Sequence, residues 1–262
     1  MNVAGQRCNC GPLYIDLLKR SISDTLYKAE PDSEGESFPA YITGFIDHYI
    51  EGHAVTMLPR RRLDHLEACV TEIERNNVPG DLIETGVWRG GATILMRALL
   101  KAYEDHERIV WVADSFEGLP EPDARISPRE AALYHGPTIQ RAYRKMAATL
   151  EEVRRNFEAY GLLDDQVRFL KGWFKDTLPG APVAELALMR LDGDYYESTL
   201  DALCNLYDKL SVGGIVIVDD YGEEQWTDCR RAVDRFREER GIRDPMMSVD
   251  SKCFWWRRTS AV

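Results

Sequence analysis

The sequence predicts an α/β fold in which a doubly wound, mostly parallel seven-stranded sheet is covered by helices on both faces. From residue 80 onward, short apolar runs alternate with longer segments of helical spacing. Strands separated by helices form right-handed βαβ units, which make neighbouring strands parallel. The segment 246–258 is patterned like an antiparallel hairpin and adds the last strands of the sheet.

The expected elements follow in order along the chain. An amphipathic helix is predicted at 59–77, where Leu63, Leu66 and Val70 share one face and Pro59 stands at the start. The five parallel strands are expected at 81–86, 108–115, 166–172, 185–192 and 214–220. The helices after residue 80 are expected at 91–105, 138–160, 198–210 and 228–241, with "SVGG" ending the third.

This pattern divides the chain into two regions. Residues 59–262 are expected to form the sheet domain, and residues 1–58 an N-terminal helical extension and lid. The extension holds two weaker helical patterns around an acidic loop at 30–37. We expect that loop to be mobile, because a short acidic stretch buries little apolar surface.

Composition and charge exclude several kinds of partner. A formal net charge of −11 argues against nucleic acid, whose binding depends on cationic contacts to phosphate. No stretch approaches the ~20 consecutive apolar residues that span a bilayer. The N-terminus lacks the apolar region of a signal peptide, and the cysteines show no C-x-x-C spacing. We therefore expect a cytoplasmic protein that acts on a small molecule.

Acidic residues stand where the predicted strands end, namely Glu84, Asp114, Asp192, Asp219 and Asp220. Ligands bind outside the carboxyl ends of parallel strands, so these side chains are expected to point into one crevice. The stretches "LDGDYYEST" (191–199) and "GGIVIVDDYG" (213–222) contain no basic residue. We therefore expect a bound cation to offset the repulsion among their carboxylates.

The spacing of these aspartates predicts a metal site. Asp192 and Asp219 end strands that are one strand–helix–strand unit apart, and adjacent strands are ~5 Å apart, so the two carboxylates can share one ion. Asp220 supplies a third ligand. Carboxylate oxygens favour Mg²⁺, and the histidines show no zinc-type spacing. Asp194 is expected to cap the helix that begins near Tyr195 rather than to bind metal.

The turn "ETGVWRGG" (84–91) indicates the cofactor. It lacks the G-x-G-x-x-G fingerprint of dinucleotide binding, and Glu84 suits a cation better than a pyrophosphate. S-adenosylmethionine carries an ammonium and a sulfonium group and no phosphate. Asp114 can accept hydrogen bonds from both ribose hydroxyls, and Trp173 and Phe174 can pack against adenine.

Taken in order, these residues resemble the macrocin O-methyltransferase family. The resemblance covers roughly residues 40–258 and rests on "ETGVWRGGATILMRALL", "WVADSFEGLP", "KGWFKDTLP", "MRLDGDYYEST" and "SVGGIVIVDDYG". Members of this family have a class I methyltransferase (Rossmann-like) sheet and methylate sugar hydroxyls in antibiotic biosynthesis, using S-adenosylmethionine and Mg²⁺. The chain length and the ending "SKCFWWRR" are similar to those of aminocoumarin-pathway enzymes that methylate the deoxysugar noviose.

The resemblance also implies a role for individual residues. Glu84 and Gly86 would contact the methionine part of the cofactor, and Asp114 and Ser115 the ribose. Trp173 and Phe174 would lie near adenine, and Asp192, Asp219 and Asp220 would hold the metal. The segment "HAVTMLP" (53–59) resembles the piece that covers the cofactor. The predicted cofactor-binding set is completed by Thr56, Met57, Thr85, Val87 and Gly172.

The implied reaction needs a base, because a sugar hydroxyl loses its proton only far above neutral pH. Coordination to a cation favours the alkoxide and orients it toward the sulfonium methyl. Asp192 is the first candidate for the base because it would lie beside both metal and hydroxyl. His135 is the second, since it lies in a long segment between a strand and a helix, where active-site covers often occur.

Two other functions fit the predicted fold. An NAD-dependent oxidoreductase would use Asp114 but would leave the aspartates at 192, 219 and 220 without a role. A non-catalytic small-molecule-binding domain would need none of the three metal aspartates, yet all are present. A homodimer is expected from the apolar N-terminal helices and from Trp255 and Trp256, which look exposed in the sequence.

Overall fold

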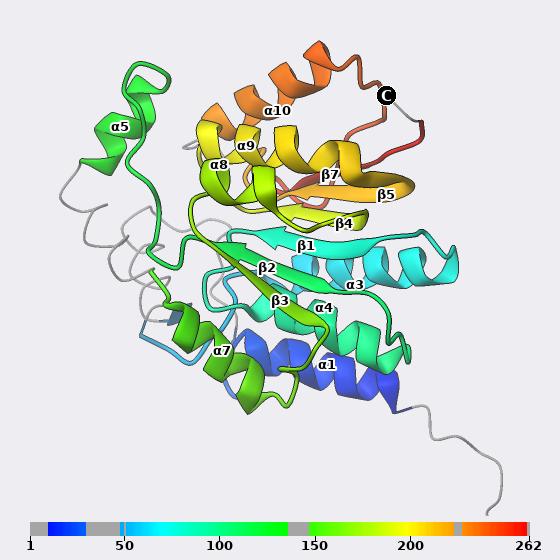
Figure 1. The fold of residues 1–262 in the computed structure, drawn as a ribbon. Coiled ribbons are helices and arrows are strands. Elements are labelled where there is room, and N and C mark those ends of the chain that lie inside the picture. Colours follow the sequence, from blue (N-terminus) through cyan, green and yellow to red (C-terminus); the bar gives the residue numbers. More distant parts are fainter. Residues whose placement is uncertain (1–9, 30–47, 50, 136–146, 223–226, 261–262) are drawn as a thin grey trace, which may run out of the picture.

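The computed structural model describes residues 10–29, 48–49, 51–135, 147–222 and 227–260 (Figure 1). The predicted acidic loop at 30–37 lies outside these residues. A seven-stranded sheet has the order β3-β2-β1-β4-β5-β7-β6. Its parallel strands are β1 (Asp81–Thr85), β2 (Val110–Asp114), β3 (Val167–Lys171), β4 (Leu186–Leu191) and β5 (Leu210–Val218). Strand β7 (Phe254–Arg257) runs antiparallel to β5 and to β6 (Met247–Ser248), which confirms the predicted fold class.

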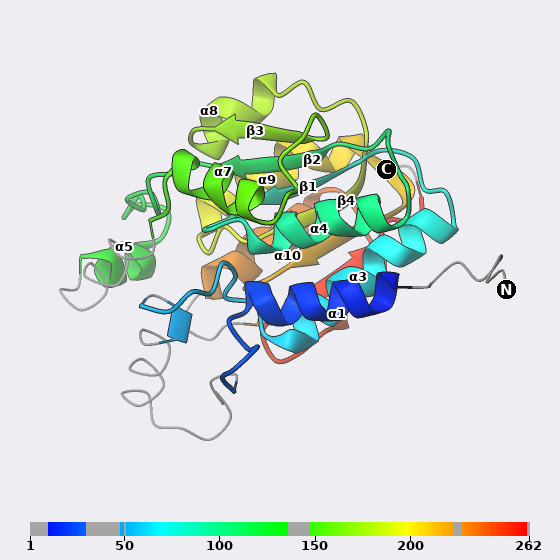
Figure 2. The same ribbon diagram turned by 90° about the horizontal axis from the view of Figure 1, so that it is seen from below.

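Helices cover both faces of this sheet (Figures 1 and 2). One face carries α3 (Arg60–Arg75), α4 (Gly91–Ala102) and α7 (Leu150–Ala159), with α1 (Gly11–Ile22) packed outside α3 and α4. The other face carries α8 (Phe174–Thr177), α9 (Tyr196–Leu206) and α10 (Thr227–Glu239), with 3-10 turns at Leu178–Gly180 and Tyr207–Lys209. Helix α5 (Pro128–Tyr134) lies on the side toward which the arrows of β1 and β2 point (Figure 1).

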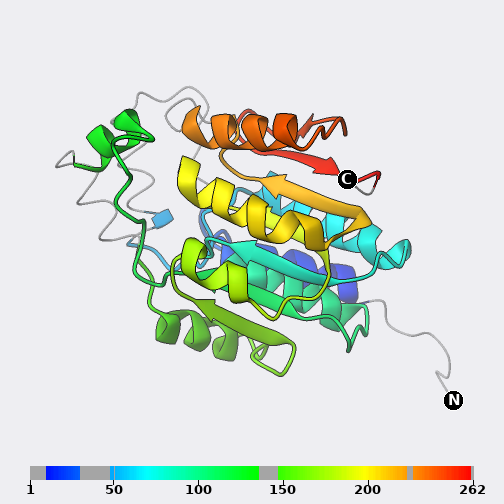
Figure 3. The ribbon, with the colours of Figure 1, turned by 45° about the horizontal axis from the view of Figure 1, so that its top comes forward.

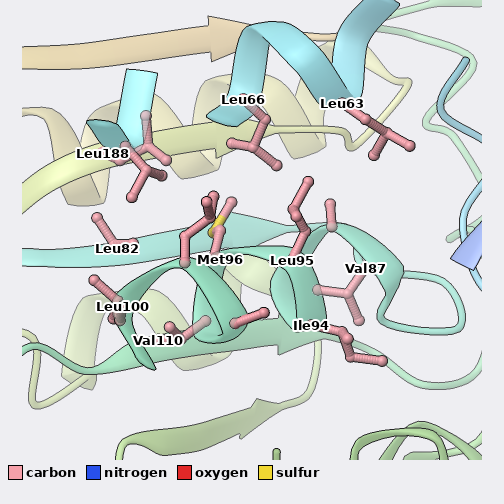
Figure 4. Close-up of a cluster of buried hydrophobic side chains, with 14 of the residues drawn as sticks. Leu63, Leu66, Leu82, Val87, Ile94, Leu95, Met96, Leu100, Val110 and Leu188 are labelled. Carbon is pink, nitrogen blue, oxygen red and sulfur yellow. The ribbon is translucent and has the colours of Figure 1, made fainter. Parts of the chain in front are cut away.

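Alternation along the strands sends successive side chains into two hydrophobic cores. On β1, Leu82 packs with residues of α3 and α4, and its neighbour Ile83 packs with residues of α9 and α10. Figure 4 shows the first core, in which Leu63 and Leu66 of α3 gather with Leu188 of β4. Near-continuous apolar runs in the sequence are therefore strands that are buried on both faces.

The helix predicted at 138–160 is shorter in the structure. It is described as α7 from Leu150, and residues 136–146 lie outside the described part of the chain. The hydroxyl of Thr149 accepts a hydrogen bond from the amide of Glu152, so Thr149 is the N-cap of this helix. Helical periodicity alone did not distinguish this start from a continuous helix.

The stretch "SVGG" was expected to end the helix at 198–210, but it lies inside β5. Helix α9 ends at Leu206, a 3-10 turn follows, and β5 begins at Leu210. The glycines of this stretch continue the strand because their backbone exchanges hydrogen bonds with that of Arg258 at 2.7 and 2.9 Å. Tertiary pairing therefore overrides the local tendency of glycine to break a strand.

Helix α1 shares the core of the sheet domain. Leu18 and Ile22 are buried among residues of α3 and α4. Lys19 is only 2% exposed, because its ammonium group lies 2.6 Å from Asp64 and also contacts Glu67 on α3. None of the helices in the described residues combines the length and the apolar character needed to cross a membrane. The division of the chain into an extension and a sheet domain stays a prediction.

We expect Leu18→Ala to lower the free energy of unfolding by about 2–5 kcal/mol, because it leaves a cavity under α1. Val212→Ala is the control, since Val212 on β5 is 55% exposed and its substitution should change stability by less than about 1 kcal/mol. Urea titration of both variants measures the difference. Equal stability of the two would mean that α1 detaches before the domain unfolds.

Candidate active site

A cavity of about 350 Å³ opens at the carboxyl ends of the parallel strands, and its walls come from the turns after β1, β2, β3 and β4. A smaller space of about 70 Å³ adjoins it, bordered by Thr56 to Leu58 and by the turn after β1. Trp88 lines both spaces. The strand order reverses between β1 and β4, which is where open α/β sheets bind ligands.

The turn after β1 lies directly against the turn after β4. Gly86 has a φ of +86°, and a Cβ atom there would lie 1.8 Å from the carbonyl oxygen of Asp192. The amide of Asp192 donates to the carbonyl of Thr85 at 2.9 Å. Only glycine combines this conformation with so close an approach. Of the predicted cofactor residues in this turn, Gly86 lines the larger cavity, Val87 lines the smaller space, and Thr85 is buried beside them.

Asp114, at the end of β2, is held in place by backbone amides. Its Oδ2 accepts from the amide of Val87 and its Oδ1 from that of Phe116, both at 2.8 Å. Burial raises the pKa of Asp114, and these hydrogen bonds oppose the shift. The hydroxyl of Ser115 donates to the carbonyl of Gly118 at 2.8 Å and fixes the start of the next loop. Asp114 and Ser115 both line the larger cavity, where the carboxylate retains lone pairs for a ligand.

The remaining predicted cofactor residues divide between the two spaces. Those after β3 line the larger cavity, and those before α3 line the smaller one: Gly172, Trp173 and Phe174, and Thr56 and Met57. The segment before α3 reaches the site because position 91 is glycine. A Cβ atom on Gly91 would lie 2.6 Å from the carbonyl oxygen of Val55, to which the Gly91 amide donates at 2.8 Å.

A buried ion pair joins β1 to β4 beneath the cavity. Glu84 and Arg190 are partners in the strand register, each is 2% exposed, and the guanidinium contacts Oε1 of Glu84. Within the described residues, Oε2 of Glu84 is buried without a hydrogen-bond partner. Burial raises the pKa of Glu84 to about 8, and Arg190 opposes this rise. Because Glu84 lines the smaller space, its free oxygen can accept a hydrogen bond from a cationic ligand.

Asp192, Asp219 and Asp220 converge where β4 and β5 end. Each offers a carboxylate oxygen that lies within 4.8 Å of the other two. Burial and repulsion from Asp219 raise the pKa of Asp192 to about 6. Burial and the neighbouring carboxylates also raise the pKa of Asp220 well above its usual range, and its Oδ2 has no hydrogen-bond partner among the residues described. Such a set of oxygens is what a hard divalent cation takes as ligands.

Two arginines partly neutralise this cluster, although the sequence had led us to expect a bound cation alone. Arg190 Nη1 lies 2.8 Å from Oδ2 of Asp192, and its Nη2 lies 2.6 Å from Oδ1 of Asp219. Arg62 of α3 lies 2.6 Å from Oδ2 of Asp219 and 2.7 Å from Asp250. The sequence analysis overlooked these arginines because it considered only the two acidic stretches, and Arg190 precedes the first of them; the bound cation stays a prediction. An arginine inside an apolar strand, two residues before an aspartate on the same face, is the signal that was available.

Asp194 and His135 do not lie as expected. Helix α9 begins at Tyr196, its N-cap residue is Tyr195, and that residue makes no side-chain cap, so the cap predicted for Asp194 was wrong; Asp194 has a φ of 58° and lines the larger cavity. Asp194 has a left-handed backbone conformation and precedes the N-cap position, which Tyr195 occupies, so its side chain does not cap the helix. His135 follows α5, is exposed, and its Nε2 lies 3.2 Å from Glu121. The described residues that line the two spaces do not include His135, so its role as a base stays a prediction.

Comparisons with known proteins agree with one another. The family model described as macrocin O-methyltransferase (TylF) matches residues 46–258. The chain is 48% identical to an 8-demethyl-8-(2,3-dimethoxy-alpha-L-rhamnosyl)-tetracenomycin-C 4'-O-methyltransferase of Streptomyces olivaceus, across 95% of this chain and 94% of that one. It is 47% identical to a demethyldecarbamoylnovobiocin O-methyltransferase of Streptomyces niveus, across 95% and 89%. The solved structure of the O-methyltransferase NovP matches with a TM-score of 0.82 and 43% identity, across 95% of this chain and 100% of that one.

Arg190→Met should lower the free energy of unfolding by about 3–5 kcal/mol, because it leaves buried carboxylates without their partner. Arg240→Met is the matched control: Arg240 pairs with Asp208 at the surface, and its loss should change stability by about 1 kcal/mol or less. Denaturant titration of both variants without added metal measures this. A cost for Arg190→Met no larger than the control would show that the pair contributes little to stability.

Proposed function

The chain belongs to the macrocin O-methyltransferase family, and on that basis we propose that it transfers a methyl group from S-adenosylmethionine to a hydroxyl of a deoxysugar on a natural product. The observation that carries the proposal is that two acidic sites lie at the same edge of the sheet, where neighbouring parallel strands end. Glu84 with its free oxygen suits the cofactor's ammonium group, and the carboxylates of Asp192, Asp219 and Asp220 lie at the ends of the next two strands. Family membership argues against the oxidoreductase alternative.

The cofactor is proposed to occupy the space between β1 and the turn after β3. Asp114 and Ser115 line the part that suits ribose, and Trp173 and Phe174 the part that suits adenine. The acceptor would enter the same cavity from the side of residues 118–122. A methyl group can then pass between the cofactor and a hydroxyl held near Asp192, with the reacting atoms oriented by the walls.

A divalent cation, best Mg²⁺, fits the carboxylates at the ends of β4 and β5. The raised pKa values of Asp192 and Asp220 support this, because burial and the neighbouring carboxylates disfavour the charged forms, which a bound cation would stabilise. Asp192, Asp219 and Asp220 would hold the ion. When bound, it would favour ionisation of a sugar hydroxyl and help to orient it.

Asp192 is the proposed general base. Burial and Asp219 raise its pKa to about 6, which brings it nearer to neutral pH and makes it a better proton acceptor than an ordinary aspartate. His135 is the second candidate, and it would have to approach the cavity from the end of α5. Transfer converts an alkoxide and a sulfonium into neutral groups, so a site from which Thr56 and Met57 help to exclude water favours the reaction.

We also propose a cytoplasmic homodimer. Helix α1 exposes Leu13 by 75% and Leu17 by 54%, which supports a contact with a second copy. Trp255 and Trp256 do not add to that surface as expected. Trp256 is fully buried, and Trp255 is half-buried, with its ring 5.2 Å from that of His65.

The activity is tested by incubating the purified protein with S-adenosylmethionine, Mg²⁺ and a glycosylated acceptor. Demethyldecarbamoylnovobiocin and the rhamnosyl tetracenomycin are suitable probes, because the two relatives are named for methylating them. Mass spectrometry should detect one added methyl group, and NMR should place it on a sugar hydroxyl. A protein that binds the cofactor but methylates neither probe would contradict the proposed acceptor class.

Glu84→Gln should weaken binding of S-adenosylhomocysteine, which keeps the ammonium group, by about 10–100-fold, since it replaces a charge-assisted hydrogen bond. Burial raises the pKa of Glu84 to about 8 although Arg190 opposes the rise, so a proton competes for this carboxylate near neutral pH in the free protein. An ammonium partner needs the carboxylate, so binding should release a proton and affinity should rise from pH 6 to pH 7. Calorimetry in two buffers measures the release, which Glu84→Gln should abolish; unchanged affinity in that variant would remove Glu84 from the cofactor site.

Asp219→Asn should reduce kcat by at least about 10²-fold while leaving cofactor affinity nearly unchanged, since it weakens metal binding but not the cofactor contacts. Asp192→Asn should be worse, because it removes a ligand and the proposed base together. Asp208→Asn, at an exposed carboxylate, is the control and should be as active as the wild type. Excess EDTA should abolish turnover, and Mg²⁺ should restore it. Full activity in EDTA would refute the metal role.

A further inference from the structure

Three helices begin at one buried cluster of polar groups beside the cavity. Ser127 is the N-cap of α5: it accepts a hydrogen bond from the amide of Glu130 and donates one to the carboxylate of Asp228, in the first turn of α10. Glu130 reaches across to α9, where its Oε1 accepts from the amide of Tyr196 at 3.1 Å. Figure 3 shows α5 beside the adjoining ends of α9 and α10.

Helix α9 takes its cap from α5 because its own N-cap residue supplies none. Position 195, where Ser, Thr, Asn or Asp would usually cap the helix, is a tyrosine that is 1% exposed and lines the larger cavity. Glu130, which lies 66 residues before Tyr196 in the sequence, takes over this function. Glu130 is 2% exposed and its Oε2 has no hydrogen-bond partner among the described residues, so the bond from the Tyr196 amide to Oε1 is the contact that connects this side chain to the start of α9.

A second carboxylate makes the connection in the opposite direction. Glu197 is the second residue of α9, and its Oε2 accepts from the amide of Asp123 at 3.1 Å. Asp123 directly follows residues 118–122, which form one wall of the cavity, and Glu197 lines the cavity itself. The Glu197 side chain of α9 therefore accepts a hydrogen bond from the backbone just after the wall. In return, the Glu130 side chain of α5 accepts one from the backbone of α9.

The wall is fixed at its beginning by different contacts. The hydroxyl of Ser115 holds the carbonyl of Gly118, and Ser115 follows β2, next to the predicted cofactor residue Asp114. Beyond Gly118, the two carboxylate–amide hydrogen bonds connect the wall and α5 to the first turn of α9. The first turn of α9 directly follows residues 192–195 in the chain. The two hydrogen bonds therefore also fix the position of the wall relative to Asp192.

We propose that Glu130 and Glu197 are positioning residues that hold the wall at 118–122 against the turn at 192–195, and so set where a sugar acceptor lies relative to Asp192. The identity of the acceptor rests on the proposed function, but the connection between wall and turn does not. Loss of either bond should loosen the acceptor side of the cavity. The cofactor side, built on β1 and β2, should keep its geometry.

The test compares Glu130→Ala with Glu130→Gln, whose side-chain carbonyl can still accept from the amide of Tyr196. Glu130→Ala should raise KM for demethyldecarbamoylnovobiocin or the rhamnosyl tetracenomycin about tenfold, the effect of losing one hydrogen bond. The dissociation constant for S-adenosylhomocysteine should change by less than about twofold, and Glu130→Gln should restore KM. Glu238→Ala, at an exposed glutamate of α10, is the control and should match the wild type.

Hydrogen exchange gives a readout that does not depend on activity. With S-adenosylhomocysteine bound, peptides that cover residues 116–127 should exchange faster in Glu130→Ala than in the wild type or Glu130→Gln. Should Glu130→Ala fail to fold, Glu197→Ala, at a partly exposed site, should show the same increases in KM and exchange. Unchanged KM together with unchanged exchange in the folded alanine variants would overturn the positioning role. If the wild type methylates neither probe, the proposed function fails, and the exchange data alone decide the positioning role.

Discussion

The site depends on the ion pairs that the buried guanidinium group of Arg190 makes. This group contacts a carboxylate at the end of each of three neighbouring strands: Glu84 on β1, Asp192 after β4 and Asp219 after β5. A buried ion is tolerated only with close partners, because its loss of water is costly. The arginine therefore fixes the ends of these strands relative to one another. The cavity forms between those ends, at the point where the strand order reverses.

The balance of charges explains why this network can still bind cationic ligands. The carboxylates of Glu84, Asp192, Asp219, Asp220 and Asp250 outnumber the two guanidinium groups of Arg62 and Arg190, and Asp194 adds a further negative charge beside Asp220. That excess of negative charge is what the two cationic groups of the proposed function, a divalent metal ion and an ammonium group, would offset. Burial of the unbalanced carboxylates raises the pKa of Glu84 and of Asp220, so each would bind a cation in place of a proton.

Local pattern was enough to predict the alternation of strands and helices and the gathering of acidic residues at one edge. It was not enough for features that depend on residues distant in sequence. Arg190 could have been identified, because a charged residue stands out inside an apolar strand. In the structure, its partner in the strand register is Glu84. Glu130 could not, since its partner is 66 residues away and no periodic pattern marks it. Asp194 looked like a helix cap because the type of residue fits, but the backbone turns before the helix begins.

The features that the sequence analysis did not predict have a common physical cause, which is that the turns around the cavity are crowded. The turn after β1 lies so close to that after β4 that a Cβ atom on Gly86 would lie 1.8 Å from the carbonyl of Asp192. Such turns have little room for side chains that cap their own backbone. Their amides are instead satisfied from elsewhere, Val87 by Asp114 on β2 and Tyr196 by Glu130 on α5. Because the supporting groups come from other elements, the turns stay fixed while the space between them remains open for a ligand.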